Sequence, residues 1–167
     1  MTGSVTTAET GLIAVQLYTL RGQAELDLLQ TISEVAALGY DGVELAGLHG
    51  LDPAEVARTC RELGLEICGA HVGVERFEDE PDAVATELRS LDLRTIVFPS
   101  LPTSSPEDGD SAIRRLHAAA TRALGLGLTP VFHNHDVELR RAADGAMLGY
   151  RDAAARPRCT PRRINGW

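Results

Sequence analysis

A short apolar segment at 129–132 opens into a cluster of polar side chains. The polar residues of this cluster are His133, Asn134, His135, Asp136 and Glu138. Imidazole nitrogens and carboxylate oxygens are the groups that bind divalent metal ions and exchange protons in proteins. His133 and His135 are two residues apart, so on an extended strand both project from the same face. The sequence therefore predicts a metal-binding or acid–base site where a buried strand ends.

Three further polar residues, Gln16, Glu44 and His71, lie at or near the ends of earlier apolar segments. Gln16 can also be explained as a partner for backbone groups, and His71 as a hydrogen-bonded core histidine. Glu44 is harder to explain in this way, because an acid inside a short apolar strand is costly unless it is paired. In parallel α/β folds the carboxyl ends of the strands carry the ligand site. We therefore expect these three side chains to share one site with residues 133–138.

Apolar strand segments alternate with amphipathic helical segments along the chain. We expect strands at 12–18, 42–46, 65–71, 95–99 and 128–132, and helices near 25–38, 53–63, 81–91 and 106–124. This alternation predicts an α/β fold with a parallel sheet and crossover helices. The spacing fits a partial (β/α)8 TIM barrel with about five parallel strands, and it also fits an open doubly wound sheet.

The composition disfavours several classes of partner. The formal net charge of −8 repels phosphate backbones, so we expect no nucleic-acid partner. No apolar run approaches the roughly 18 residues that a membrane span needs, and the N-terminus lacks the basic and apolar regions of a secretory signal. Three cysteines in 167 residues do not suggest a disulfide framework, and the spacing of Cys60 and Cys68 matches no zinc signature. We expect a cytoplasmic protein with a flexible N-terminal segment, 1–11, and no membrane partner.

Four stretches in sequence order have a familiar pattern. They are Val15–Arg21, Leu38–Leu45, Leu63–Val72 and His133–Glu138. Together they resemble the sugar phosphate isomerase/epimerase family, the xylose isomerase-like TIM barrels, over about residues 12–139. The resemblance implies a (β/α)8 barrel with a divalent metal ion, Mn²⁺, Mg²⁺ or Co²⁺, at its carboxyl-terminal mouth. It also implies an enzyme that moves a proton between adjacent carbons of a small-molecule sugar or sugar phosphate, with the cation stabilising the charge that develops.

The same resemblance implies roles for individual residues. Glu138 is the expected metal-binding carboxylate and a catalytic residue, His133 is a further metal ligand, and His135 is a second catalytic residue. The residues expected to bind the sugar are Gln16, Glu44, His71 and Asn134. The alternative interpretation of the whole cluster is a polar strand end that binds no metal.

The resemblance stops after Leu139. Residues 140–167 contain seven arginines and little apolar periodicity, so we expect a disordered tail that is not family sequence. No sixth, seventh or eighth strand is recognisable, and a shifted reading frame after Leu139 would explain the change. We therefore expect a family member truncated after about five βα units, with unpaired sheet edges that favour homo-oligomers.

Truncation leaves other functions open. One alternative is a non-catalytic remnant of the family that lacks most of the metal ligands. Another is an endonuclease IV-like DNA repair protein. The acidic charge disfavours it, and five histidines are too few for the trinuclear zinc site that such an enzyme needs. A basic nucleic-acid arm is the alternative interpretation of the tail, and the acidic body argues against it.

Overall fold

The computed structural model describes residues 11–100 and 109–136, in which five strands alternate with helices. The strands are β1 (Ala14–Gln16), β2 (Gly42–Leu45), β3 (Glu66–His71), β4 (Thr95–Phe98) and β5 (Thr129–Phe132). The helices are the 3-10 helix η1 (Leu17–Leu20), α1 (Arg21–Leu26), α2 (Leu28–Ala37), α3 (Pro53–Glu62), α4 (Val74–Asp79), α5 (Pro81–Ser90) and α6 (Gly109–Gly125). The predictions for residues 1–10 and 140–167 lie outside the described residues.

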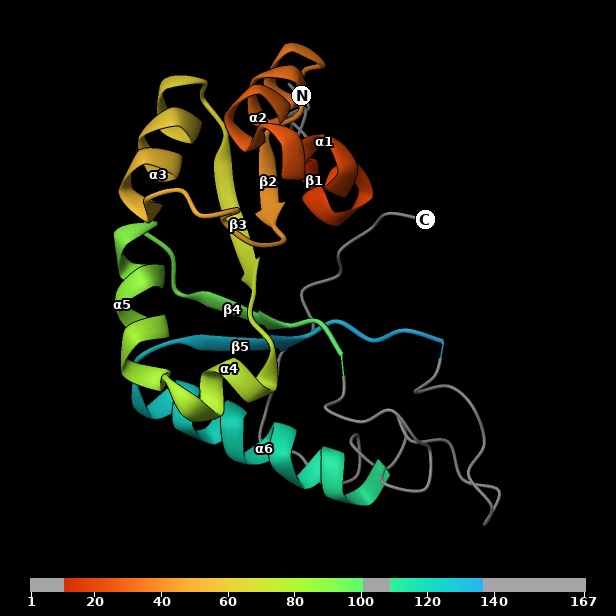
Figure 1. Cartoon of the computed structure of the whole chain (residues 1–167), viewed down its shortest axis with the longest axis vertical. Helices are drawn as coiled ribbons and strands as arrows, with labels where there is room; N and C mark the ends of the chain where they lie inside the picture. Colours follow the sequence, from red (N-terminus) through yellow and green to blue (C-terminus); the bar gives the residue numbers. More distant parts are fainter. Residues whose placement is uncertain (1–10, 101–108, 137–167) are drawn as a thin grey trace, which may run out of the picture.

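The five strands form one parallel sheet in the order β1-β2-β3-β4-β5. In a barrel, the strands lie side by side in the same order as in the sequence. In a doubly wound sheet, the order of the strands reverses at a switch point. The partial (β/α)8 barrel is therefore confirmed over the open doubly wound alternative. Helices α3, α5 and α6 lie along one side of the twisted sheet, and the arrowheads of β2 to β5 approach the same region (Figure 1). Self-association through the sheet edges stays a prediction.

Local sequence signals explain where several helices begin. Asp52 precedes Pro53 at the start of α3, and its carboxylate accepts hydrogen bonds from the backbone N–H of Ala54 at 2.7 Å and of Glu55 at 3.3 Å. This is the usual cap for the free N–H groups of a first helical turn. Gly64 follows α3 with φ +74°, a left-handed conformation that ends helices with little strain. The strand β3 can therefore start immediately after it.

The predicted helix at 25–38 is wrong in one respect, because the structure has two helices, α1 and α2, in that region. Asp27 is extended between them, with φ −157°, and caps α2 by accepting the Gln30 N–H at 2.9 Å. The hydroxyl of Thr31 donates to the backbone carbonyl of Asp27 at 2.8 Å. The Asp27 side chain pairs a free backbone N–H at the start of α2 and so stabilises the break between the two helices. The apolar periodicity of the sequence does not reveal this break.

Two other boundaries differ from the sequence prediction. The strand expected at 12–18 ends at Gln16, and residues 17–20 form η1. Helix α4 was not predicted, since its six residues carry only Val74 and Phe77 as buried apolar side chains. Phe77 is fully buried and meets Phe98 of β4 edge-to-face, with ring centroids 5.6 Å apart. That contact fixes a helix too short to show periodicity.

The core lies between the sheet and its helices. Alternate strand residues such as Val43, Leu45, Ile96 and Phe98 belong to this core and are at most 1% exposed. Successive side chains of a strand point to opposite faces, so Glu44 and Val97 project from the other, inner face. The candidate site is therefore built on the face that the helices do not cover.

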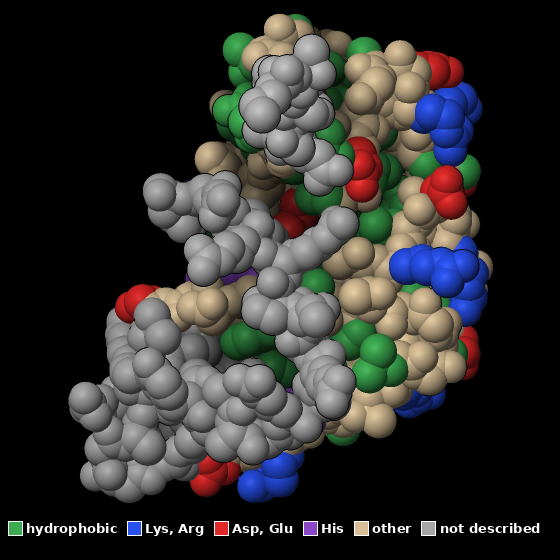
Figure 2. Space-filling view, turned by 180° about the vertical axis from the view of Figure 1, so that it is seen from behind, with side chains coloured by type: hydrophobic (Ala, Val, Ile, Leu, Met, Phe, Trp, Pro, Cys, Tyr) green, Lys and Arg blue, Asp and Glu red, His purple; other side chains and the backbone are tan. Residues whose placement is uncertain are grey.

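Acidic and basic side chains alternate along the outer helices, as the view from behind shows (Figure 2). On α3, Arg58 lies within 3.8 Å of Glu55 and 3.9 Å of Glu62. These exposed pairs contribute little to stability. None of the helices in residues 11–100 and 109–136 has the length and apolar character needed to span a membrane.

Candidate functional site

Glu44 is a buried acid on the inner face of β2, with a side chain that is 7% exposed. Its position depends on a β-bulge, because Val43 pairs with Ile67 while Glu44 pairs with Gly69, which leaves Cys68 as an extra residue on β3. The Cys68 thiol donates to the backbone carbonyl of Val43 at 3.2 Å. Bulges commonly redirect side chains next to active sites. This one places the Glu44 carboxylate opposite a residue that has no side chain.

Gly69 provides the space that Glu44 occupies. A Cβ atom at this position would lie 3.5 Å from both Cγ and Oε2 of Glu44, and 2.9 Å from Cγ2 of Val97. The backbone of Gly69 does not have a positive φ, so the need for glycine here is steric. Close packing of the inner face therefore holds the carboxylate in one place.

His71, at the end of β3, is the direct partner of Glu44. Its Nε2 lies 2.7 Å from Oε1 of Glu44, and its side chain is 12% exposed. The amide nitrogen of Gln16, at the end of β1, lies 3.4 Å from the same imidazole nitrogen. Gln16 and Glu44 are register partners across β1 and β2. A nitrogen that donates its hydrogen to Glu44 cannot also accept one from Gln16, so the pairing of Gln16 depends on the tautomer of His71.

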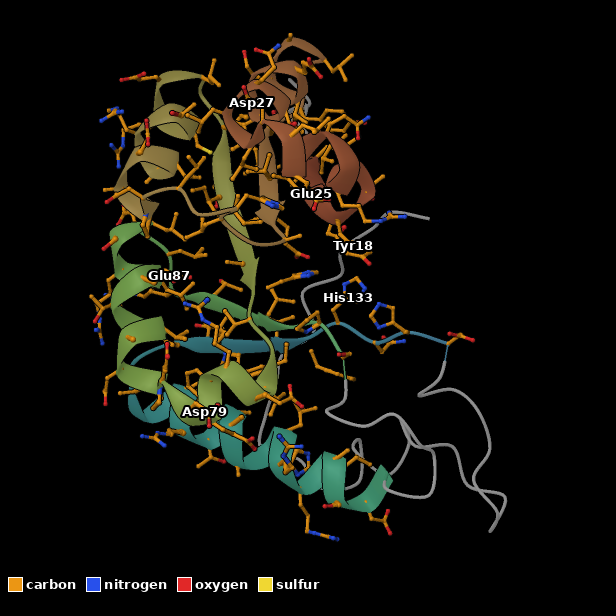
Figure 3. The ribbon with its side chains drawn as sticks, viewed as in Figure 1. Tyr18, Glu25, Asp27, Asp79, Glu87 and His133 are labelled. Atoms are coloured by element: carbon orange, nitrogen blue, oxygen red, sulfur yellow. The ribbon has the colours of Figure 1, made fainter. Side chains whose placement is uncertain are left out.

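His133 joins this pair from the fifth strand. Its backbone N–H donates to the carbonyl of Phe98 at 2.9 Å, which extends the ladder of β4 and β5 by one residue. Its ring centroid lies 5.5 Å from that of His71. Figure 3 shows His133 at the end of β5, on the side of the sheet away from α5. Strands β2, β3 and β5 thus bring a carboxylate and two imidazoles together.

Glu44, His71 and His133 each offer one ligand atom, and these atoms all lie within 4.8 Å of one another. Two imidazole nitrogens and one carboxylate oxygen form a donor set that suits zinc and related divalent ions, and a catalytic zinc site commonly has three protein ligands. Ligand atoms that share a tetrahedral ion are about 3.3 Å apart, given metal–ligand distances of about 2.0–2.2 Å. Small side-chain rotations would therefore be enough, and the residues fit a metal ion.

The other predicted residues are only partly assembled around this group. The ring of His135 is exposed, and its centroid lies 5.0 Å from that of His133. Asn134 is exposed, and its amide donates to the backbone carbonyl of His135 at 3.5 Å; no contact between Asn134 and the group appears among the described residues. Glu138 lies outside the described residues. Glu44, which is buried, and His71, which is half-buried, were predicted as sugar-binding residues, and the structure adds them to the candidate metal ligands.

A cavity of about 270 Å³ adjoins His71. The charged pair at its wall is Arg76 of α4 with Glu87 of α5, in which Arg76 Nη1 donates to Glu87 Oε1 at 3.1 Å. This hydrogen bonding raises the pKa of Arg76, so its guanidinium stays charged. His49, which sequence analysis did not single out, also lines the cavity. The core residues Leu45 and Ala70 also line this cavity, so it lies on the helix-covered side of the sheet and not on the inner face that carries Glu44.

Comparison with known proteins identifies the fold. No family model matches the sequence, and no curated protein matches it. A sugar phosphate isomerase/epimerase from Parabacteroides distasonis superposes with a TM-score of 0.71 at 17% identity, over 90% of this chain and 66% of its own. A family 2 AP endonuclease from Brucella melitensis gives 0.57 at 19% identity, over 72% and 54% of the two chains.

A xylose isomerase domain protein from Salmonella typhimurium gives a TM-score of 0.54 at 13% identity, over 77% of this chain and 51% of its own. The fold is a partial xylose isomerase-like TIM barrel. The chain spans slightly less than two thirds of the two Parabacteroides structures, at 66% and 64% of their length. At these identities the likeness concerns the fold, and a xylose isomerase-like barrel supports several chemistries.

Proposed function

We propose that this chain carries part of the active site of a metal-dependent sugar or sugar-phosphate isomerase/epimerase, which moves a proton between adjacent carbons of its substrate. The observation that carries the proposal is the group Glu44, His71 and His133, whose ligand atoms converge within 4.8 Å at the carboxyl ends of β2, β3 and β5. Parallel barrels bind substrates at this edge. The names of the superposed isomerase/epimerase and xylose isomerase domain structures support the same class of reaction.

Glu44, His71 and His133 would hold the metal ion. A bound divalent cation supplies positive charge that stabilises the negative charge developing when a proton leaves the carbon next to a carbonyl. The bulge at Glu44 and the glycine at position 69 keep the carboxylate in place without solvent around it. Of the three, Glu44 is the most buried, so its charge needs a partner in every state of the enzyme.

The remaining predicted residues bind or react with the sugar. Gln16, beside His71, and Asn134, at the exposed end of β5, have amide groups that hydrogen-bond sugar hydroxyls. We assign proton transfer to His135 and Glu138, as the resemblance implies. Because Glu138 also counts as a metal ligand in that assignment, its substitution should affect both metal binding and turnover.

Isomerisation or epimerisation of a panel of ketoses and ketose phosphates, with Zn²⁺, Mn²⁺ or Mg²⁺ added, tests this function. We expect the wild-type chain to be active and Glu44→Gln to lose activity by at least about tenfold, as loss of a group at a metal site typically does. Glu66→Gln is the matched control, because Glu66 is an exposed acid at the opposite, amino-terminal end of β3. A wild-type chain inactive with every metal would instead support the non-catalytic alternative.

A further inference from the structure

Strand β1 is an open edge of the sheet. Among the strands in residues 11–100 and 109–136 it pairs with β2 alone, and its three residues, Ala14–Gln16, are exposed or half-buried. Figure 1 shows β1 beside β2, at the opposite end of the sheet from β5. An edge strand presents backbone N–H and C=O groups with which a further strand can pair, and proteins commonly protect such an edge with charged side chains or proline.

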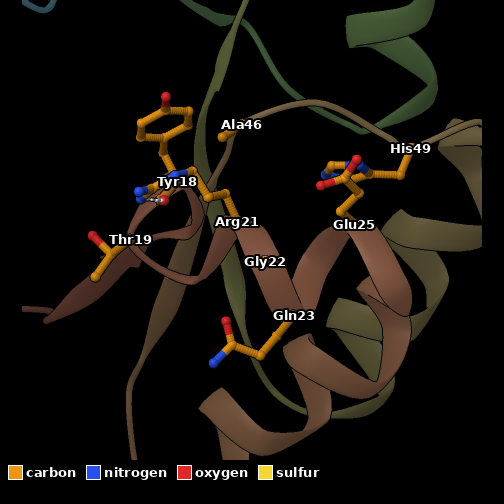
Figure 4. Close-up of a pocket in the computed structure, with 8 residues that line it drawn as sticks. All are labelled: Tyr18, Thr19, Arg21, Gly22, Gln23, Glu25, Ala46 and His49. Carbon is orange, nitrogen blue, oxygen red and sulfur yellow. Dashed lines mark hydrogen bonds between the residues drawn. The ribbon is translucent and has the colours of Figure 1, made fainter.

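The sequence around β1 lacks this protection. From Gly11 to Leu20 it contains no charged residue and no proline. The first cation that follows, Arg21, is held against Tyr18: its Nη1 donates to the Tyr18 carbonyl at 3.2 Å, and its Cζ lies 4.8 Å from the centroid of the Tyr18 ring (Figure 4). Both residues line a cavity of about 550 Å³ beyond the carboxyl end of β1. The charge of Arg21 therefore does not protect the start of the strand.

Exposed apolar side chains lie where β1 begins. Leu12 and Ile13 are 68% and 63% exposed. The N–H of Ile13 donates to Oδ2 of Asp41 at 2.8 Å, and its carbonyl accepts the Asp41 N–H at 2.8 Å. These two bonds bring the segment before β2, which carries the exposed Leu38 and Tyr40, beside the start of β1. Exposed apolar side chains that are grouped in this way mark an interaction surface, whereas single ones do not.

The charge of the chain favours a contact at this edge over one elsewhere. Two copies that each carry a net charge of −8 repel one another, and the repulsion is weakest where the facing segments are uncharged. The other edge strand, β5, contains Pro130, which has no backbone N–H to offer a further strand. A two-fold contact uses the same surface on both copies, so one uncharged apolar edge is sufficient for it.

We propose that two copies of this chain associate through their β1 edges, with Leu12 and Ile13 of each copy packed against the other copy. A two-fold axis at the edge pairs the two β1 strands antiparallel, so that the sheet continues from one copy into the other. The carboxyl ends of the two sheets then point in opposite directions, and the candidate metal site of each copy stays open. The contact is independent of the proposed function.

Sedimentation velocity of the full chain over a series of concentrations tests this contact. We expect wild type to dimerise reversibly and Leu12→Glu to raise the dimer dissociation constant by at least about tenfold, because each dimer loses two apolar contacts and gains two like charges. Leu124→Glu is the matched control and should dimerise as wild type does. Leu124 is 53% exposed near the end of α6, which packs against β5 at the other end of the sheet.

Salt separates this contact from an ionic one. Added salt should strengthen dimerisation through β1, because it screens the repulsion between two acidic copies. Association that salt weakens would instead indicate attraction between opposite charges, such as the arginines of residues 140–167 with acidic side chains, and would overturn the proposal.

Amide hydrogen exchange gives a second measurement. Residues 12–16 should exchange more slowly above the dimer dissociation constant than far below it, and Leu12→Glu should abolish the difference. Circular dichroism checks that the variants are folded, and Leu12→Ser, which removes the apolar contact without adding charge, keeps the test valid if Leu12→Glu is not. A wild-type monomer at every concentration up to about 1 mM, equal weakening in Leu12→Glu and Leu124→Glu, or exchange at residues 12–16 that is independent of concentration overturns the proposal.

Discussion

The substitution Gly69→Ala examines the packing that holds Glu44 in place. The added Cβ would lie 2.9 Å from Cγ2 of Val97, whereas carbon atoms in contact are normally about 3.5–4.0 Å apart. Val97 is 1% exposed and β-branched, so it has little freedom to move away. Overpacking of this kind costs about 1–3 kcal/mol, and the lower entropy of unfolded alanine returns about 0.4–1 kcal/mol. We expect a net loss of about 1–2 kcal/mol in the free energy of unfolding.

Urea unfolding of four proteins measures this effect as a double-mutant cycle: wild type, Gly69→Ala, Val97→Ala and the double variant. If the clash is the cause, Val97→Ala should make the alanine at 69 less costly, with a coupling energy of about 1 kcal/mol. Gly22→Ala is the control, because a Cβ there meets nothing within 4 Å and should stabilise α1 by up to about 1 kcal/mol. A neutral Gly69→Ala, or strictly additive effects in the cycle, would refute the steric reasoning.

Three other predictions concern the scaffold. Asp52→Ala removes the acceptor of two backbone N–H groups at the start of α3, so urea unfolding should show a loss of about 1 kcal/mol, and an unchanged stability would contradict the capping role. Burial raises the pKa of the Cys60 thiol to about 11, so alkylation at pH 8 should modify it only after unfolding; rapid labelling in the native chain would show that the site is open. Hydrogen bonding from Arg115 lowers the pKa of Glu78 below its usual 4.5, so this pair stabilises the fold above that pH and loses its effect as the pH falls through the folded pKa. The stability difference between wild type and Glu78→Gln should accordingly shrink on acidification, and a constant difference from pH 7 to pH 3 would speak against the pair.

The strands and the larger helices were predictable because each has a strong local signal. Helix α3 begins after Asp52 at Pro53 and is followed by Gly64, and β4 is apolar from Ile96 to Phe98. The break at Asp27 was not predictable in this way, since a capping side chain interrupts a pattern that reads as one helix. Helix α4 depends on a contact between Phe77 and Phe98, which are distant in sequence. Tertiary packing decides such elements, and local propensity does not.

The sequence predicted which residues meet at one edge of the sheet, but it did not predict how their side chains are arranged there. Polar residues at strand ends identified Gln16, Glu44, His71 and His133 as neighbours, because parallel strands end at a common edge. The bulge that directs Glu44 towards His71 has no signal in the sequence beyond the glycine at 69. His49, which lines the cavity beside His71, has a positive φ, and the glycines at 47 and 50 were the available hint of that backbone shape. The role of Glu138 remains a prediction, since it lies outside the described residues.

Metal binding by Glu44, His71 and His133 is the central claim, and calorimetric titration of the metal-free chain with Zn²⁺ tests it most directly. The proposed site predicts that wild type binds one ion, and that Glu44→Gln and His133→Gln each weaken binding by at least about tenfold. Glu66→Gln and His117→Gln, which change the same residue types elsewhere, should bind as wild type does. Equal affinity in all five proteins, or no binding by wild type at millimolar Zn²⁺, would contradict the claim.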